Sequence, residues 1–173
     1  THNTLGPYRA ERISDTAGLT QFGALIEVLP PGSRSSHSHW HAAEDEMILM
    51  LDGTLTLTEN GVATILEPGD AACWRAGEPV AHCMYNHADA PARYVVIGTR
   101  AAQDTVTYPD LDRVLHHDRL SDTRRYTPLA GPPAAKPSSP SRSPPPLRPD
   151  PPAHGGRAGH TADWPRHRDA AVW

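Results

Sequence analysis

The chain has 173 residues, which is enough for one domain with a proper core and too few for two ordinary domains. Its formal charge of −4 is too small to indicate a nucleic-acid partner, and without a run of 18 apolar residues no transmembrane helix is expected. The start of the chain has no basic-then-apolar signal pattern. Because Cys73 and Cys83 are too few for a disulfide framework, we expect a cytoplasmic protein.

Composition divides the chain into four segments. We expect an N-terminal arm at 1–19, an all-β domain at 20–105, and an extension at 106–127 that packs on this domain. The last segment, 128–173, holds most of the 19 prolines and carries net positive charge. Such a segment buries too little apolar surface to offset the entropy of ordering it, so we predict a disordered or polyproline-like tail. A docking ligand and an out-of-frame translation of a GC-rich gene are the alternatives for this tail.

Short runs with strand character recur at intervals of about ten residues, with turn residues between them. This spacing is typical of an all-β sandwich or barrel. Asn60-Gly61 joins two such runs and predicts a two-residue hairpin turn, because that turn type needs positive φ at both positions. A short helical turn is expected within 109–120. The predicted strands are 20–29, 46–51, 54–59, 62–67, 71–74, 82–86 and 92–99.

Histidines alternate along the segment His37-Ser38-His39-Trp40-His41. Side chains two apart on a strand share a face and lie about 7 Å from each other, so two of these imidazoles can bind one ion. A divalent metal then needs further ligands from distant segments, and Glu46 and His82 are the candidates. A His-x-His pattern alone is weak, since surface histidines on an edge strand would also explain it.

These residues resemble the cupin superfamily. The first cupin motif resembles His39-x-His41, a four-residue gap, Glu46 and then Gly53. The second resembles Pro68-Gly69-Asp70, followed by Pro79, His82 and Asn86. The resemblance covers roughly residues 20–100 and is similar to compact single-domain bacterial cupins. It implies a double-stranded β-helix, or jelly-roll barrel, in which His39, His41, Glu46 and His82 hold a metal ion, with a homodimer as the family expectation.

The register of this motif has an alternative, because His37, His39 and Glu44 show the same four-residue gap. Six residues after Glu44 lies no glycine, whereas six residues after Glu46 lies Gly53, so we choose the second register. His37 is then a residue of the rim. Gly32 lies one residue further from the motif than is usual in the family. That offset indicates a bulge or a shifted register.

Other polar residues receive structural interpretations. We expect Glu44 and Asp45 to be solvated turn acids, although either could orient a ligand imidazole. Asn86 is expected to hydrogen-bond a turn, and Cys83 to be a small buried residue. Residues expected at the surface or in packing are Trp40, Arg75, His87, Arg93, His116 and His117.

The predicted site implies chemistry of a general kind. Three neutral imidazoles and one carboxylate leave a divalent ion with a net charge of about +1 and with open coordination positions. Fe, Mn, Ni, Co, Cu and Zn all suit this ligand set. We expect a metal-dependent enzyme acting on a small organic molecule, with Glu46 as its catalytic residue. The reaction would be a dioxygenation or an isomerase, lyase or decarboxylase step. The alternative is a non-catalytic module that binds or senses a small molecule.

Overall fold

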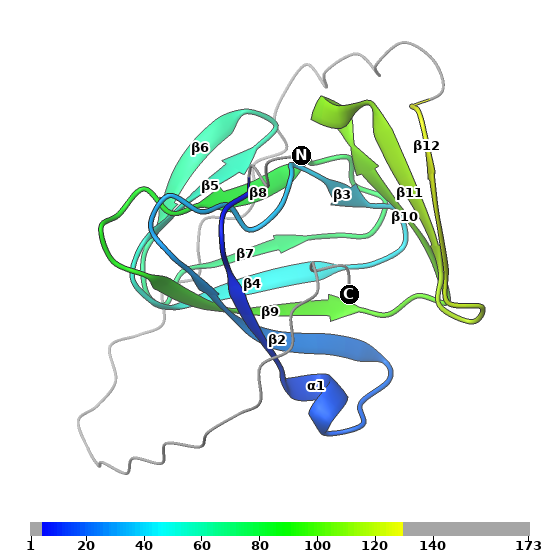
Figure 1. Ribbon diagram of the computed structural model, residues 1–173, viewed down its shortest axis with the longest axis horizontal. Helices are drawn as coiled ribbons and strands as arrows, with labels where there is room; N and C mark the ends of the chain where they lie inside the picture. Colours follow the sequence, from blue (N-terminus) through cyan, green and yellow to red (C-terminus); the bar gives the residue numbers. More distant parts are fainter. Residues whose placement is uncertain (1–4, 130–173) are drawn as a thin grey trace.

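The computed structural model describes residues 5–129, so the predicted tail lies almost wholly outside the described residues. This part of the chain is built mainly of strands (Figure 1). The elements in chain order are β1 (Arg9–Arg12), α1 (Ile13–Thr16), β2 (Phe22–Leu29), β3 (Trp40–His41), β4 (Glu46–Asp52), β5 (Leu55–Glu59), β6 (Val62–Leu66), β7 (Ala71–Trp74), β8 (His82–Tyr85), β9 (Ala92–Thr99), β10 (Gln103–Tyr108), the 3-10 turn η1 (Pro109–Leu111), β11 (Arg113–Asp118) and β12 (Thr123–Thr127).

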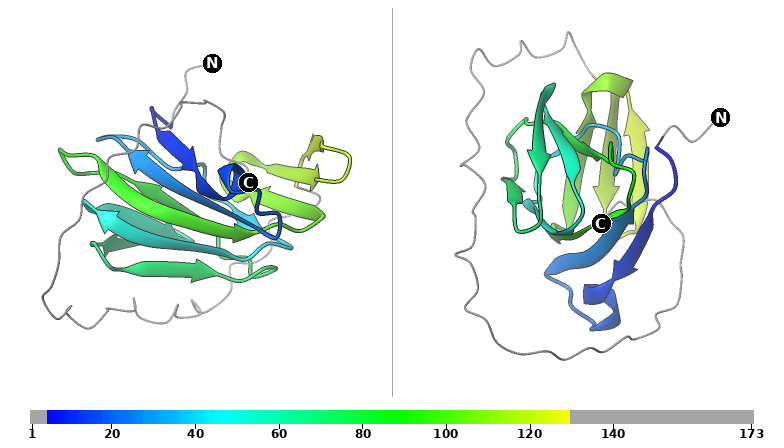
Figure 2. Two further views of the ribbon diagram at one scale, coloured as in Figure 1. Left: turned by 90° about the horizontal axis from the view of Figure 1, so that it is seen from below. Right: turned by 90° about the vertical axis from the view of Figure 1, so that its left-hand side faces the viewer.

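The strands form three antiparallel sheets. Five strands lie in the order β1-β2-β9-β4-β7, four in the order β12-β11-β10-β3, and three in the order β6-β5-β8. Figure 1 shows the five-stranded sheet across the lower half of the molecule, with the other two sheets above it on either side. Figure 2 shows the same sheets in two further views, each turned by 90°. The predicted all-β double-stranded β-helix is confirmed.

A backbone bridge links the two smaller sheets beside β3. His39 lies just before β3 and His82 is the first residue of β8, and each donates its amide to the carbonyl of the other at 3.1 and 2.9 Å. This bridge joins β3 to β8 at the seam between the two sheets. Two histidines that are 43 positions apart in the sequence are therefore held side by side by main-chain hydrogen bonds.

Two glycine-containing turns fix the register of the strands around this seam. Asn60 and Gly61 have φ of 46° and 84°, so both central residues of the β5–β6 hairpin are left-handed, as the sequence predicted. Gly53 has φ of 74°, and a Cβ there would lie 2.9 Å from the Cα of Ala92. A side chain at position 53 would thus meet β9 as well as being strained.

The core fills the space between the sheets with inward-facing aliphatic and aromatic residues. Ile48 and Met50 are almost fully buried, and both share the face of β4 that carries Glu46. The buried cluster comprises Leu25, Leu29, Ile48, Met50, Leu55, Leu57, Leu66, Trp74, Met84, Ala92, Tyr94 and Val96.

Both ends of the described chain contain strands that the sequence did not predict. The short helical turn expected within 109–120 is confirmed at 109–111, and Arg113–Asp118 form β11, which pairs with β10 and β12. His116 and His117 therefore lie in a sheet, and His117 is buried. The arm at 1–19 contains β1, which pairs with β2, and the single turn of α1. Among the described residues, no helix is long and apolar enough to cross a membrane.

Candidate metal centre

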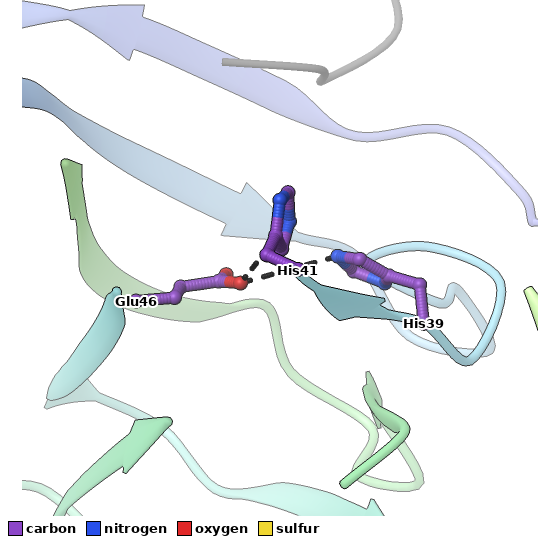
Figure 3. A group of neighbouring side chains, drawn as sticks. All are labelled: His39, His41 and Glu46. Atoms are coloured by element: carbon purple, nitrogen blue, oxygen red, sulfur yellow. Dashed lines mark ion pairs between the residues drawn. The ribbon is translucent and has the colours of Figure 1, made fainter. Parts of the chain in front are cut away.

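The four predicted ligands come from three separate segments of the chain. His41 lies in β3, Glu46 begins β4, and His82 begins β8, while His39 forms the bridge to His82. His41, Glu46 and His82 are buried, and the His39 side chain is only 12% exposed. Figure 3 shows His39 and His41 turned toward the carboxylate of Glu46. The imidazole rings of His39 and His82 are 4.9 Å apart.

One carboxylate oxygen is the centre of this arrangement. Glu46 Oε2 lies 3.2 Å from His82 Nε2, 3.7 Å from His41 Nε2 and 3.9 Å from His39 Nε2. Donor atoms of His39, His41 and Glu46 all lie within 4.8 Å of one another, which is close enough for one ion. His82 is not a member of that mutual group, and it joins the cluster through its contact with Glu46.

The other nitrogen of each ring is already engaged. His39 Nδ1 lies 2.9 Å from the carbonyl of His37, and His82 Nδ1 lies 3.0 Å from the carbonyl of Val80. His41 Nδ1 lies 2.7 Å from Asp104 Oδ2. Carbonyl and carboxylate oxygens only accept hydrogen bonds, so Nδ1 carries the hydrogen in each ring. In the neutral imidazole, Nε2 then presents a lone pair.

Three lone pairs and a carboxylate oxygen thus converge with no hydrogen of their own to share. His41 Nε2 is buried and has no hydrogen-bond partner within residues 5–129. Such a buried acceptor is costly unless a positive charge lies between these atoms. A divalent metal ion satisfies this requirement, because imidazole nitrogen and carboxylate oxygen are ordinary ligands of such ions. The cluster is therefore compatible with a metal ion.

The protonation states of His39 and Glu46 support metal binding. Burial lowers the pKa of His39 to about 4, so this imidazole is neutral at neutral pH and its lone pair is available. Burial would raise the pKa of Glu46, but the hydrogen bond that a protonated His82 donates and the charges of the protonated imidazoles lower that pKa to about 2. Glu46 is thus an anion over the whole physiological pH range.

A buried network behind His41 fixes the orientation of that ring. Asp104, in β10, accepts from His41 Nδ1 with one oxygen and from the amide of Ala43 with the other, at 2.7 and 2.8 Å. Glu44 lies 4.0 Å from the same ring nitrogen and accepts two hydrogen bonds from Arg119 Nη2, at 2.8 and 3.1 Å. A hydrogen bond that a ligand imidazole donates to a carboxylate sets the tautomer of the ring and raises its basicity.

This network also explains a second close group of acidic and imidazole side chains, formed by His41, Glu44 and Asp104. Burial lowers the pKa of His41, but the hydrogen bond to Asp104 and the three nearby carboxylates outweigh it, so the pKa is raised. The expectation that Glu44 is a solvated turn acid is wrong, since it is 3% exposed. Its contacts hold β10 and β11 against the segment that carries His41.

Two aromatic rings pack against the imidazoles. The indole of Trp74 stacks on His82 with a centroid separation of 3.6 Å, and its Nε1 donates to Glu59 at 2.8 Å. Tyr108 stacks on His39 at 5.7 Å. These contacts restrict rotation of both rings and exclude water from one side of the cluster. The cluster is thus held in place by packing as well as by hydrogen bonds.

A pocket opens beside the cluster. His39, Glu46 and His82 form one part of its wall, and the remaining lining comes from Glu27, Ser35, Ser36, Met84 and Val96. The lining is only partly apolar, because Glu27 adds a second buried carboxyl group to it. The serines precede the histidine motif, and Ser36 Oγ lies 3.2 Å from His39 Nδ1.

The other residues singled out in the sequence lie outside the cluster. Asn86 donates to the carbonyls of Leu29 and Ala90 and accepts from the amide of Ala88, so it holds a turn as expected. Cys83 is buried, as expected. Asp45 is exposed and accepts from the amide of Ala76 at 2.7 Å. Arg75 and Arg93 are exposed, and His37 is half-buried beside the cluster.

Sequence reasoning missed Glu27 and Asp104. Glu27 interrupts the apolar series Leu25, Leu29 on the buried face of β2, and a charge at such a position is a recognisable signal. Asp104 shares parity with buried Val106 in β10. Both were detectable as carboxylates on a buried face, although their partners were not.

Comparison with known proteins assigns the family. The model of the cupin domain matches residues 25–98. The structure of a sugar phosphate isomerase of the cupin superfamily from Silicibacter pomeroyi is 33% identical, with a TM-score of 0.70, over 77% of this chain and 83% of that one. A proposed sugar phosphate isomerase from Acidithiobacillus ferrooxidans is 26% identical, with a TM-score of 0.67, over 73% and 80%. No curated protein matches significantly. The chain belongs to the cupin superfamily.

Proposed function

We propose that this cupin is a metal-dependent isomerase of a sugar phosphate. The observation that carries the proposal is the likeness to the Silicibacter pomeroyi protein, which extends over most of both chains at 33% identity. The donor set of His39, His41, Glu46 and His82 beside a partly polar pocket supports the same conclusion. A pocket lined by serines and carboxyl groups suits a ligand with several hydroxyl groups better than an apolar one.

The proposed reaction needs no external oxidant or reductant. When an aldose becomes a ketose, the proton on C2 is transferred to C1, and the hydroxyl proton at C2 is transferred to the oxygen on C1. A bound divalent ion would supply a Lewis acid that polarises the sugar carbonyl. His39, His41 and His82 would hold the ion with their Nε2 atoms.

Glu46 is the proposed catalytic residue, because its carboxylate is the anionic group at the centre of the cluster and also lines the pocket. In this role it accepts the carbon-bound proton and returns it to the neighbouring carbon. The surrounding imidazoles and the stacked Trp74 fix its position and exclude water, which keeps the proton from exchanging freely.

The test is isomerisation of aldose and ketose phosphates by the full chain loaded in turn with Fe, Mn, Ni, Co, Cu and Zn. Nuclear magnetic resonance in deuterated water would follow the product and the deuterium at C1 and C2. We expect turnover with at least one ion and none with the metal-free protein. Absence of both product and exchange with every ion would contradict the proposal. Tight binding of a sugar phosphate without product would instead favour a binding module.

A further inference from the structure

A second polar group faces the pocket away from the histidines. Glu27 lies in β2, between Leu25 and Leu29 on the buried face of that strand, and is only 3% exposed. In the sheet it lies opposite Tyr94 of β9. The pocket lining includes Glu27, and the cupin motifs do not.

Glu27 is held by one neighbour. The hydroxyl of Tyr94 donates a short hydrogen bond to Glu27 Oε2, and this is its single side-chain hydrogen bond among the described residues. Within residues 5–129, Glu27 forms no ion pair with an arginine, lysine or histidine. A buried carboxyl group without a cation is expensive in its ionised form. Burial accordingly raises the pKa of Glu27 to about 7, with Glu46 adding a smaller repulsion.

The sheet register separates Glu27 from the metal cluster. Glu27 is opposite Tyr94, whereas Glu46 is opposite Gly98, four residues further along β9. At about 3.3 Å per residue, the two carboxyl-bearing positions are roughly 13 Å apart along the sheet. Met84 and Val96 line the pocket as well, and they add an apolar wall. The pocket thus has two polar ends, and a ligand of several carbons can span both.

We propose that Glu27, held in place by Tyr94, forms a second ligand-binding site in the pocket, which binds a hydroxyl group on the carbon chain between the reacting carbons and the phosphate of the substrate. The proposal rests on the proposed function and adds the direction in which the substrate lies. A carboxyl group that is partly protonated near neutral pH can accept from a hydroxyl or donate to it. It repels a phosphate whenever it is ionised, so the phosphate of the substrate lies away from Glu27.

Equilibrium binding tests this site without requiring turnover. The full chain, loaded with one divalent metal, is titrated by calorimetry with glucitol 6-phosphate, an acyclic polyol phosphate that cannot isomerise. Hexyl phosphate serves as the matching probe without hydroxyl groups. The variants are Glu27→Leu, Glu27→Gln and Tyr94→Phe. Glu11→Gln is the control, because Glu11 lies in the adjacent strand β1 opposite Ile26, whose neighbour Glu27 faces the other side of the sheet.

We expect Glu27→Leu to weaken binding of the polyol phosphate about ten-fold or more, the usual size for a lost buried hydrogen bond, and to leave hexyl phosphate unaffected. Glu27→Gln retains hydrogen-bonding groups and should recover most of the affinity. Tyr94→Phe should give an intermediate loss and is the variant to use if Glu27→Leu does not fold. Metal content, measured by mass spectrometry, should be equal in all of these proteins.

Two results would overturn the proposal. One is unchanged polyol affinity in Glu27→Leu and Tyr94→Phe at full metal content. The other is a wild-type protein that binds glucitol 6-phosphate no better than hexyl phosphate. Either result leaves the isomerase proposal standing if the wild-type protein still turns over a sugar phosphate. Conversely, hydroxyl-dependent binding that is lost in Glu27→Leu, without turnover of any sugar phosphate, would support this site and contradict the isomerase.

Discussion

The two ends of the pocket place the same residue type in opposite electrostatic settings. Glu46 and Glu27 are both buried, and burial acts on both in the same direction. At one end three imidazoles surround Glu46, and its pKa is about 2. At the other end a tyrosine hydroxyl is the neighbour of Glu27, and the pKa is about 7. Burial alone therefore does not decide the charge of a carboxyl group, because its neighbours do.

The largest effect is expected at the imidazole end. Glu46→Ala removes the anion on which the three Nε2 atoms converge, so we expect both metal content and any turnover to fall by about a hundred-fold or more. Metal analysis and the isomerase assay measure these two quantities. Glu46→Gln keeps the size of the side chain. A Glu46→Gln protein that retained full metal content and full turnover would contradict the catalytic role.

The raised pKa of Glu27 should make the free energy of unfolding depend on pH. The folded-state pKa is raised from 4.5 to about 7, so the folded state holds a proton that the unfolded state has already released. The stabilising contribution of this proton is complete below pH 4.5 and is lost as pH rises to 7. Relative to wild type, metal-free Glu27→Gln should gain up to about 3 kcal/mol over this interval.

Urea unfolding of both proteins at several pH values measures this difference. The groups that act on Glu27 are Tyr94 and Glu46, so Tyr94→Phe should move the midpoint of the transition. Parallel stability curves for wild type and Glu27→Gln between pH 4.5 and 7 would show that Glu27 titrates in the same range in both states. That result would remove the contrast between the two carboxyl groups.

A smaller effect is expected from the network behind His41. Asp104→Asn keeps the shape of the side chain but removes the charge that orients Nδ1, and we expect metal affinity to fall about 10–100-fold. Competition with a chelator measures this affinity. Asp45→Asn is a matched control, since Asp45 is exposed and, within residues 5–129, its side chain accepts a hydrogen bond only from the loop amide of Ala76. Equal losses in both variants would contradict a specific role for Asp104.

The smallest effect is expected from a substitution at Gly53, which lies outside the pocket lining. Gly53→Ala places a Cβ against β9 at a residue with φ of 74°, so we expect a loss of stability of about 1–3 kcal/mol. Thermal unfolding measures the loss. Gly61→Ala is the comparison, because its φ is also positive but a Cβ there meets open space. A larger loss at Gly61 would show that the contact with Ala92 is unimportant.

The sequence predicted the strands well wherever turn residues bounded short apolar runs. The Asn60-Gly61 hairpin follows from local chemistry, because few residues tolerate two successive left-handed conformations. β11 and β12 were not predicted, since their pattern of arginines, histidines and aspartate lacks clear alternation. β1 was missed for a similar reason: an isolated run of four residues gains its stability from pairing with β2, which is a tertiary effect.

The sequence likewise predicted one part of the candidate site and not the other. Motif spacing named His39, His41, Glu46 and His82, and the structure brings them together around one carboxylate oxygen. The residues that orient or extend the cluster come from positions 27, 94, 104 and 119. Their roles depend on which strands become neighbours, and spacing along a chain carries no information about that. Glu44 shows the same limit, because its burial depends on Arg119, which lies 75 positions away.

The backbone bridge between His39 and His82 couples ion binding to the stability of the contact between β3 and β8. The two hydrogen bonds beside β3 and β8 are donated by the amides of two residues of the cluster itself. A cation bound by both side chains would add a second link between β3 and β8. Separation of these two strands would then require release of the ion. Hydrogen–deuterium exchange at these two amides should slow on loading, making them built-in reporters of occupancy.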